Sequence, residues 1–170
     1  MSSRKKKNNF KKVQEELQRA FKADKDLKGY GLKVEVVEGK ARLQGIVDTL
    51  IEKERATNLA QDIPGVEKVD NAISISTDGP ITDSEVEFEV AEELAQAPGV
   101  ELQHIGGKSH RGTVLLKGEA LKPHEIEAAR RAAAKARGVK RVISQVKVKK
   151  PLKTLEEIFH SQVRNDKEDS

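Results

Sequence analysis

Residues 39–75 of this 170-residue chain occur a second time as residues 112–148, with no insertion or deletion between the two copies. Adding 73 to a residue number in the first copy gives its counterpart in the second. Residues identical in both copies occupy the first-copy positions Gly39, Leu43, Gly45, Glu52, Glu54, Ala56, Ala60, Gly65, Val66 and Val69. A match at a fixed offset indicates a duplicated structural unit. The chain is therefore expected to fold as two copies of one small domain.

The first copy is expected to begin with a helix, followed by two strands. Apolar residues between Phe10 and Phe21 fall on one stripe at helical spacing, which predicts an amphipathic helix. Residues 32–37 alternate in the manner of a strand, and Glu38-Gly39 predicts a tight turn into a second strand.

A second helix and a third strand complete the first copy. Thr49 and Glu52 have the spacing of a capping box, which satisfies free amide donors at a helix start. Pro64-Gly65 is expected to end this helix, with Gly65 as its C-cap, and apolar residues up to Ile75 predict the third strand.

The second copy is expected to repeat this order, with one difference. Thr82 and Glu85 form another capping box, and helical spacing follows them. Residues 100–105 are expected to form the first strand, and residues 106–111, GGKSHR, a longer and looser hairpin connection than in the first copy.

These patterns predict an α+β fold: two small α/β sandwich domains of the order helix-strand-strand-helix-strand, each with a three-stranded mixed sheet and two helices, plus a C-terminal helix. The expected divisions are a disordered basic arm (1–9), the first domain (10–76), a linker (77–81), the second domain (82–149), and a C-terminal helix with a frayed tail (150–170).

Composition limits both the core and the chemistry. Aromatic residues make up only 3% of the chain, so each core has to be built mainly from Val, Ile, Leu and Ala. The absence of cysteine excludes disulfides, thiolate nucleophiles and cysteine-based zinc sites. The basic start of the chain leads into no apolar segment, and no stretch has the length of a membrane span, so we expect a cytoplasmic protein.

One set of residues in the first copy and the strand before it forms a family-like pattern: Val34, Val36, Gly39, Leu43, Gly45, Glu52, Ala56, Gly65, Val66, Val69, Asn71 and Ile73. With the helix that precedes it, this pattern resembles the BON domain, a bacterial module. The second copy keeps most of the pattern but has Ser144 at the position of Asn71. The resemblance implies an α/β sandwich and a non-enzymatic binding role that involves phospholipid surfaces or, in one relative, potassium ions.

No catalytic constellation and no cofactor is expected. His104 and His110 lie close in sequence, and a metal pair there is one interpretation, although no third ligand is in view. Glycines and valines repeated in both copies favour structural roles as turns, strand kinks and helix ends over sites of close ligand approach. These structural positions are Gly39, Gly45, Gly65, Val66, Gly112, Gly118, Gly138 and Val139.

Two basic clusters are the candidate functional residues. The net charge is +4, yet the bases concentrate at the N-terminus and around the last strand of the second copy, where Val146 and Val148 are expected to face the core. The candidates for an anionic partner are Arg4, Lys5, Lys6, Lys7, Lys140, Arg141, Lys147, Lys149 and Lys150. Lysines on an edge strand also serve to prevent strand addition, which is an equally good interpretation of this cluster.

We therefore expect a non-enzymatic cytoplasmic binding or adaptor protein that contacts an acidic phospholipid surface or another polyanion. Non-specific nucleic-acid binding through backbone phosphates and a potassium-responsive module are the alternatives. The expected C-terminal helix has a narrow apolar stripe that suits docking on the protein's own sheet, a protein partner or a homodimer.

Overall fold

Two domains of the same fold follow each other in this computed structural model, which describes residues 2–77, 79–100 and 104–149. The elements of the first domain are α1 (Ser2–Ala23), β1 (Lys33–Val37), β2 (Lys40–Val47), α2 (Leu50–Gln61) and β3 (Lys68–Ile75). Those of the second are α3 (Asp83–Gln96), β4 (Ile105–His110), β5 (Thr113–Ala120), α4 (Pro123–Ala134) and β6 (Arg141–Val148). The predicted α+β class and element order are confirmed; the predicted C-terminal helix lies outside the described residues.

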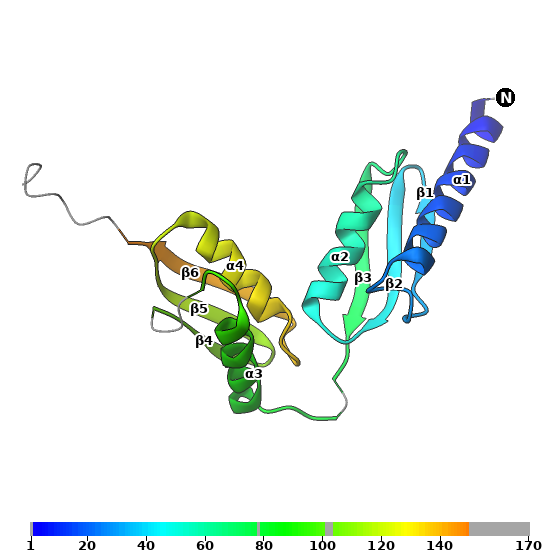
Figure 1. Ribbon diagram of the computed structural model, residues 1–170. Helices are drawn as coiled ribbons and strands as arrows, with labels where there is room; N and C mark the ends of the chain where they lie inside the picture. The colour runs from blue at the N-terminus through cyan, green and yellow to red at the C-terminus, as the bar shows by residue number, and fades with distance from the viewer. Residues whose placement is uncertain (1, 78, 101–103, 150–170) are drawn as a thin grey trace, which may run out of the picture.

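Each domain has a three-stranded mixed sheet with its second strand in the middle. In the first sheet, β1 pairs antiparallel with β2, and β3 pairs parallel with β2; β4, β5 and β6 repeat this arrangement. The two helices of each domain cover one face of its sheet and leave the other face open (Figure 1). A central strand therefore alternates between buried core residues and residues on the open face.

The two cores consist of aliphatic residues, as the scarcity of aromatics predicts. Leu17 and Phe21 of α1 pack on Leu43 and Ile73 of the first sheet. In the second domain, the inner side of α4 is alanine-rich and completely covered, with Ala129 and Ala133 at 0% exposure. Short alanine side chains allow this helix to lie close to the sheet.

Residues 2–9, expected to be a disordered arm, instead form the first turns of α1. Lysine is a good helix former, and extending an existing helix requires no new nucleation. The side chains of Lys5, Lys6 and Lys7 are exposed on these turns. The basic residues at this end are therefore displayed on a helix.

The hairpin of the second domain is tight, where a loose connection was expected. β4 runs through the GGKSH sequence, and the turn is Arg111-Gly112, with φ of 48° and 85°. Glu38-Gly39 makes the same turn in the first domain, with φ of 48° and 80°. The sequence expectation failed because pairing with β5 holds these glycines in a strand despite their weak intrinsic strand preference.

Three smaller expectations are also corrected. Thr49 is the N-cap of α2, but its side chain makes no capping hydrogen bond to the helix backbone, because its hydroxyl donates to Glu52 Oε1 at 2.7 Å. The capping box of Thr82 at α3 is complete. The C-cap of α2 is Asp62, so Gly65 lies beyond the helix end. Val148 is 41% exposed near the open end of its edge strand, unlike the buried Val146.

The domains touch through α2 and α4. Leu50 of α2 is buried with the core of the second domain, and Ile51 and Ile75 pack against that core. Arg130 of α4 reaches across and binds Glu54 of α2, with 2.8 Å between Nη1 and Oε1. Figure 1 shows these two helices facing each other. In the described part of the chain, no helix is long and apolar enough to cross a membrane.

Candidate binding surface

The predicted basic residues of the second copy lie along β6. Arg141 begins the strand, Lys147 lies near its end, and Lys149 follows it, all three exposed. The amide of Lys149 donates to the carbonyl of Ala120 at 2.7 Å, which continues the ladder with β5 and keeps Lys149 in register with Lys147. Lys140 precedes the strand, and Lys150 lies outside the described residues.

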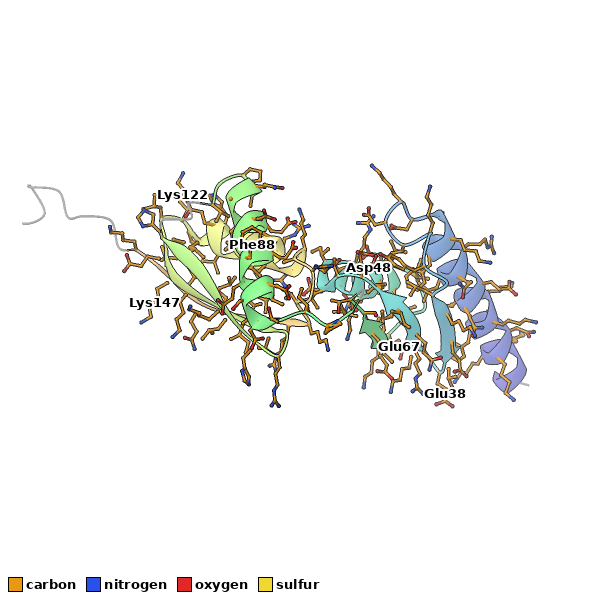
Figure 2. All side chains as sticks on the ribbon, turned by 90° about the horizontal axis from the view of Figure 1, so that it is seen from below. Glu38, Asp48, Glu67, Phe88, Lys122 and Lys147 are labelled. Carbon is orange, nitrogen blue, oxygen red and sulfur yellow. The ribbon has the colours of Figure 1, made fainter. Side chains whose placement is uncertain are left out.

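Alternation along the strands places these residues on the open face of the second sheet together with others. Lys108 of β4 and Lys117 of β5 share this side with Arg141, Lys147 and Lys149. We call the open side of the second sheet the basic face; its outward residues are Gly106, Lys108, His110, Thr113, Leu115, Lys117, Glu119, Arg141, Ile143, Gln145, Lys147 and Lys149. Figure 2 shows Lys147 and Lys122 on opposite sides of this domain.

Charge on the basic face is mostly unpaired. It carries five Lys or Arg residues and one acid, Glu119, which lies beside Lys147 in the register. Lys108 approaches Glu87 of α3 at 3.9 Å with a side chain that is 83% exposed, so this contact neutralises little. The face therefore presents a formal charge of about +4 to solvent.

Apolar residues lie at the centre of this charged surface. Leu115 is directly beside Ile143 in the register between β5 and β6, and Ile143 is 38% exposed. The corresponding residues of the first domain are Arg42 and Asp70, which form an ion pair at 3.9 Å. The two copies thus differ at the centre of the open face: an ion pair occupies it in the first domain and an apolar pair in the second.

The open face of the first domain is also less basic. The matching positions hold four bases, and two acids, Glu35 and Asp70, flank Arg42 on either side. Its formal charge is about +2, with Arg42 engaged by its neighbour. The second domain therefore offers the stronger surface for an anion.

Basic residues at the N-terminus lie far from this surface. Figure 1 shows the start of α1 and the end of β6 at opposite ends of the molecule. Lys6, Lys7 and Lys11 instead border a groove of about 390 Å³ whose apolar wall includes Phe10 and Val37. The structure thus separates the two predicted clusters into two surfaces.

The suggested histidine pair does not assemble. His104 immediately precedes β4 and His110 ends it. A strand of this length separates its ends by about 17 Å. Among the described residues, no group of three or more histidine, aspartate or glutamate side chains is placed to hold a metal ion.

A cleft of about 1050 Å³ lies between the domains, and its charges largely satisfy one another. Arg55 binds Asp24 and Asp26, and Arg130 binds Glu54 and Glu127. Hydrogen bonds from Arg130 lower the pKa of Glu127, which is the behaviour of a structural ion pair. We therefore interpret the cleft as part of the domain interface.

The sequence interpretation missed Lys108 and Lys117. Lys108 was assigned to a loop, and Lys117 is isolated in sequence from the other bases. The repeat offset contained the missing signal, because it aligns residues 106–110 with strand β1. Applying it through the first strand would have placed Lys108 on the open face.

Comparison with protein families identifies the BON domain twice, at residues 11–77 and 82–150. The comparison with curated proteins gives no match. Among solved structures, CdsD, a structural protein of the type III secretion system of Chlamydia trachomatis, is 18% identical, with a TM-score of 0.36 over 91% of this chain and 68% of that one. A structure of the C-terminal domain of CdsD is 17% identical, with a TM-score of 0.34 over 82% and 67%.

The two family matches cover most of the chain and coincide with the two αββαβ units of the structure. Each unit carries the glycine turn, the strand glycine and the buried apolar residues of its second and third strands that the sequence resemblance rests on, whereas Gly107 and Ser109 of the second unit replace Val34 and Val36. The chain therefore belongs to the BON domain family and contains two consecutive copies of the domain.

Proposed function

We propose that this protein is a non-enzymatic cytoplasmic adaptor whose basic face binds the surface of an acidic phospholipid bilayer. The observation that carries the proposal is the Leu115–Ile143 pair, in which Leu115 is half-buried and Ile143 is 38% exposed, surrounded by the exposed bases Lys117, Arg141 and Lys147. Bases attract anionic head groups at about 1 kcal/mol each. Apolar side chains between these bases add contact with the boundary of the acyl chains. Stable membrane association generally needs two such contributions, here charge attraction and apolar contact.

Nucleic acid is a weaker candidate for the same surface. Single-strand binding relies on aromatic side chains that stack on bases, and no aromatic residue other than His110 lies on the basic face. Phosphate contacts alone would remain, and these would leave the apolar pair without a role. The lysines at the start of α1 are assigned to the same anionic partner as a second, separate contact.

Vesicle co-sedimentation tests the proposal. The protein is mixed with phosphatidylcholine vesicles that contain or lack phosphatidylglycerol, and with a DNA duplex as a separate arm, in sodium and in potassium chloride at equal ionic strength. We expect binding only to the acidic vesicles, with no preference for either cation. Tighter binding to DNA, or a response that requires potassium, would contradict the proposal.

A matched pair of variants localises the contact. Lys117→Glu, Arg141→Glu and Lys147→Glu together should weaken vesicle binding by about 100-fold or more. The control carries the same charge change on the open face of the first domain: Lys33→Glu, Lys40→Glu and Lys68→Glu. All six residues are exposed, so folding should be preserved. Equal losses of vesicle binding in the two variants would show that the total charge of the protein, and not the basic face, determines binding.

A further inference from the structure

Each three-stranded sheet has two edge strands, and the first helix of each domain closes one of them. Gln14 Oε1 accepts the outward N–H of Val36 in β1 at 3.0 Å, and Gln18 Nε2 donates to the carbonyl of Leu32 at 2.9 Å. These side chains occupy the backbone groups that an added strand would need. The β1 edge is therefore protected by α1.

The same device protects β4 in the second domain. Glu87 Oε1 accepts the N–H of Ser109 at 2.9 Å, and Asp83 Oδ1 accepts the N–H of Arg111, also at 2.9 Å. Glu87 is the repeat counterpart of Gln14, so the hydrogen bond is preserved while the residue type has changed.

The β3 edge is tied to its helix by Asn71. Its Oδ1 accepts the outward N–H of Ile73 at 3.0 Å, while its Nδ2 donates to the carbonyl of Lys53 and to Thr57 Oγ1, both at 2.7 Å. One amide side chain thus occupies an edge donor and attaches the strand to α2.

Within the described residues, the fourth edge, β6, lacks this protection. Ser144 replaces Asn71, and its hydroxyl accepts the N–H of Val146 at a long 3.4 Å. The Ser144 side chain makes no hydrogen bond to α4. Among the described residues, the bond between Val146 and Ser144 is the one side-chain hydrogen bond to the outer edge of β6. Figure 1 shows β6 at the margin of its sheet.

The backbone groups that β6 turns outward can be identified. Arg141 and Lys149 donate their amides to carbonyls of the β5 side, at 3.2 and 2.7 Å. In a parallel edge strand, alternate residues direct their backbone N–H groups away from the neighbouring strand. The N–H groups of Val142, Ser144 and Val148 therefore face outward from the edge. No described strand pairs with them.

We propose that the outer edge of β6 binds an extended acidic segment of a partner protein, which adds as a fourth strand to the second sheet. Residues of the added strand that point to the open side would lie beside Arg141 and Lys147, so Asp or Glu fits there. Residues that point to the other side would lie beside Val142 and the 41%-exposed Val148, so apolar residues fit there. The partner segment therefore alternates acidic and apolar residues.

Like charges disfavour a second copy of β6 as the occupant. An antiparallel pair of β6 strands centred on Gln145 would place Arg141 opposite Lys149 and Ile143 opposite Lys147. Like charges directly opposite each other destabilise a strand pair. Edge lysines that prevent self-association in this way also select an acidic partner.

The test uses the full chain and a short synthetic peptide of alternating valine and glutamate, with a valine–lysine peptide as the control. Amide hydrogen exchange followed by NMR should slow at Val142, Ser144 and Val148 when the acidic peptide is present. The lysine peptide should have no effect. Slowing only at the β1 or β4 edge, or equal binding of both peptides, would overturn the proposal.

A matched pair of variants at Ser144 separates strand addition from binding to the basic face. Ser144→Pro removes one outward N–H and should abolish peptide binding but leave vesicle binding unchanged, while Ser144→Ala should retain both. Arg141→Glu with Lys147→Glu should weaken binding of the acidic peptide about tenfold and make the lysine peptide the preferred ligand. Unchanged peptide preference, or a concentration-dependent dimer through β6 in sedimentation, would contradict the proposed partner.

Discussion

Arg55 holds the carboxylate of Asp24 through two nitrogens, with 2.7 Å from Nη2 to Oδ2 and 2.9 Å from Nε to Oδ1. Asp24 is only 9% exposed, and it also accepts the backbone N–H groups of Asp26 and Leu27. This single carboxylate therefore organises the loop after α1 and attaches it to α2. The side-chain hydrogen bond from Arg55 is the main cause that lowers the pKa of Asp24.

Acid should weaken the first domain through Asp24. Because its pKa in the folded state is below the unfolded value, its contribution is complete above the unfolded pKa and is lost as pH falls through the folded pKa. Asp24→Asn keeps an oxygen acceptor but loses the charge, and should lower the free energy of unfolding by about 2 kcal/mol at pH 7. The cost should shrink below about pH 4.

Urea unfolding of the wild type and Asp24→Asn between pH 3 and 7 checks this expectation. Asp26→Asn is the matched control, because Asp26 also contacts Arg55, at 3.3 Å, but is 55% exposed. Its effect should stay below about 0.5 kcal/mol. A difference between wild type and Asp24→Asn that does not vary with pH would contradict the assignment.

Gly118 should tolerate no side chain. It lies in β5 with φ of 133°, and a Cβ there would overlap the carbonyl oxygen of His104. Backbone atoms cannot move aside as a side chain can, so Gly118→Ala should destabilise the second domain by about 3 kcal/mol or more. Gly106→Ala is the control in the neighbouring strand, since a Cβ there meets nothing within 4 Å. Thermal unfolding of the two variants should differ clearly, and equal melting temperatures would refute the close approach.

Much of the fold could be predicted from the repeat, because one offset transfers each element from the first copy to the second. The prediction failed at residues 106–110, where glycines and polar residues mask a strand that is held by pairing with β5. The contact of Arg130 with Glu54 was also beyond prediction. It joins residues 76 apart, and nothing in a local pattern indicates which helices of two domains will meet.

Arg130 should control the ionisation of Glu127. Glu54 and Glu127 are counterparts in the two repeats, and both bind the guanidinium of Arg130 at 2.8 Å. Arg130→Ala removes the hydrogen bonds that lower the pKa of Glu127, so this pKa should rise toward its ordinary value in an NMR titration. Arg131→Ala, on the same helix, should change it less, because Arg131 acts on Glu127 only through its charge. A pKa of Glu127 that is indifferent to Arg130 would show that the Arg130–Glu127 ion pair within α4 does not form in solution.

Exchanging the central pair of the open faces should exchange their membrane affinity. Leu115→Arg with Ile143→Asp gives the second domain the ion pair of the first, and adds no net charge. Since the lost apolar contact is worth about 1 kcal/mol for each partly buried side chain, binding to acidic vesicles should fall at least about tenfold. Electrostatic attraction is screened by salt but the apolar contact is not, so this loss of vesicle binding should persist at 0.5 M sodium chloride.

The reciprocal variant, Arg42→Leu with Asp70→Ile, should strengthen vesicle binding by the first domain. This is measured by co-sedimentation in the Lys117→Glu, Arg141→Glu, Lys147→Glu background. If neither exchange alters binding, the lysines and arginines act alone, and the apolar pair at the centre of the basic face belongs to a different interaction.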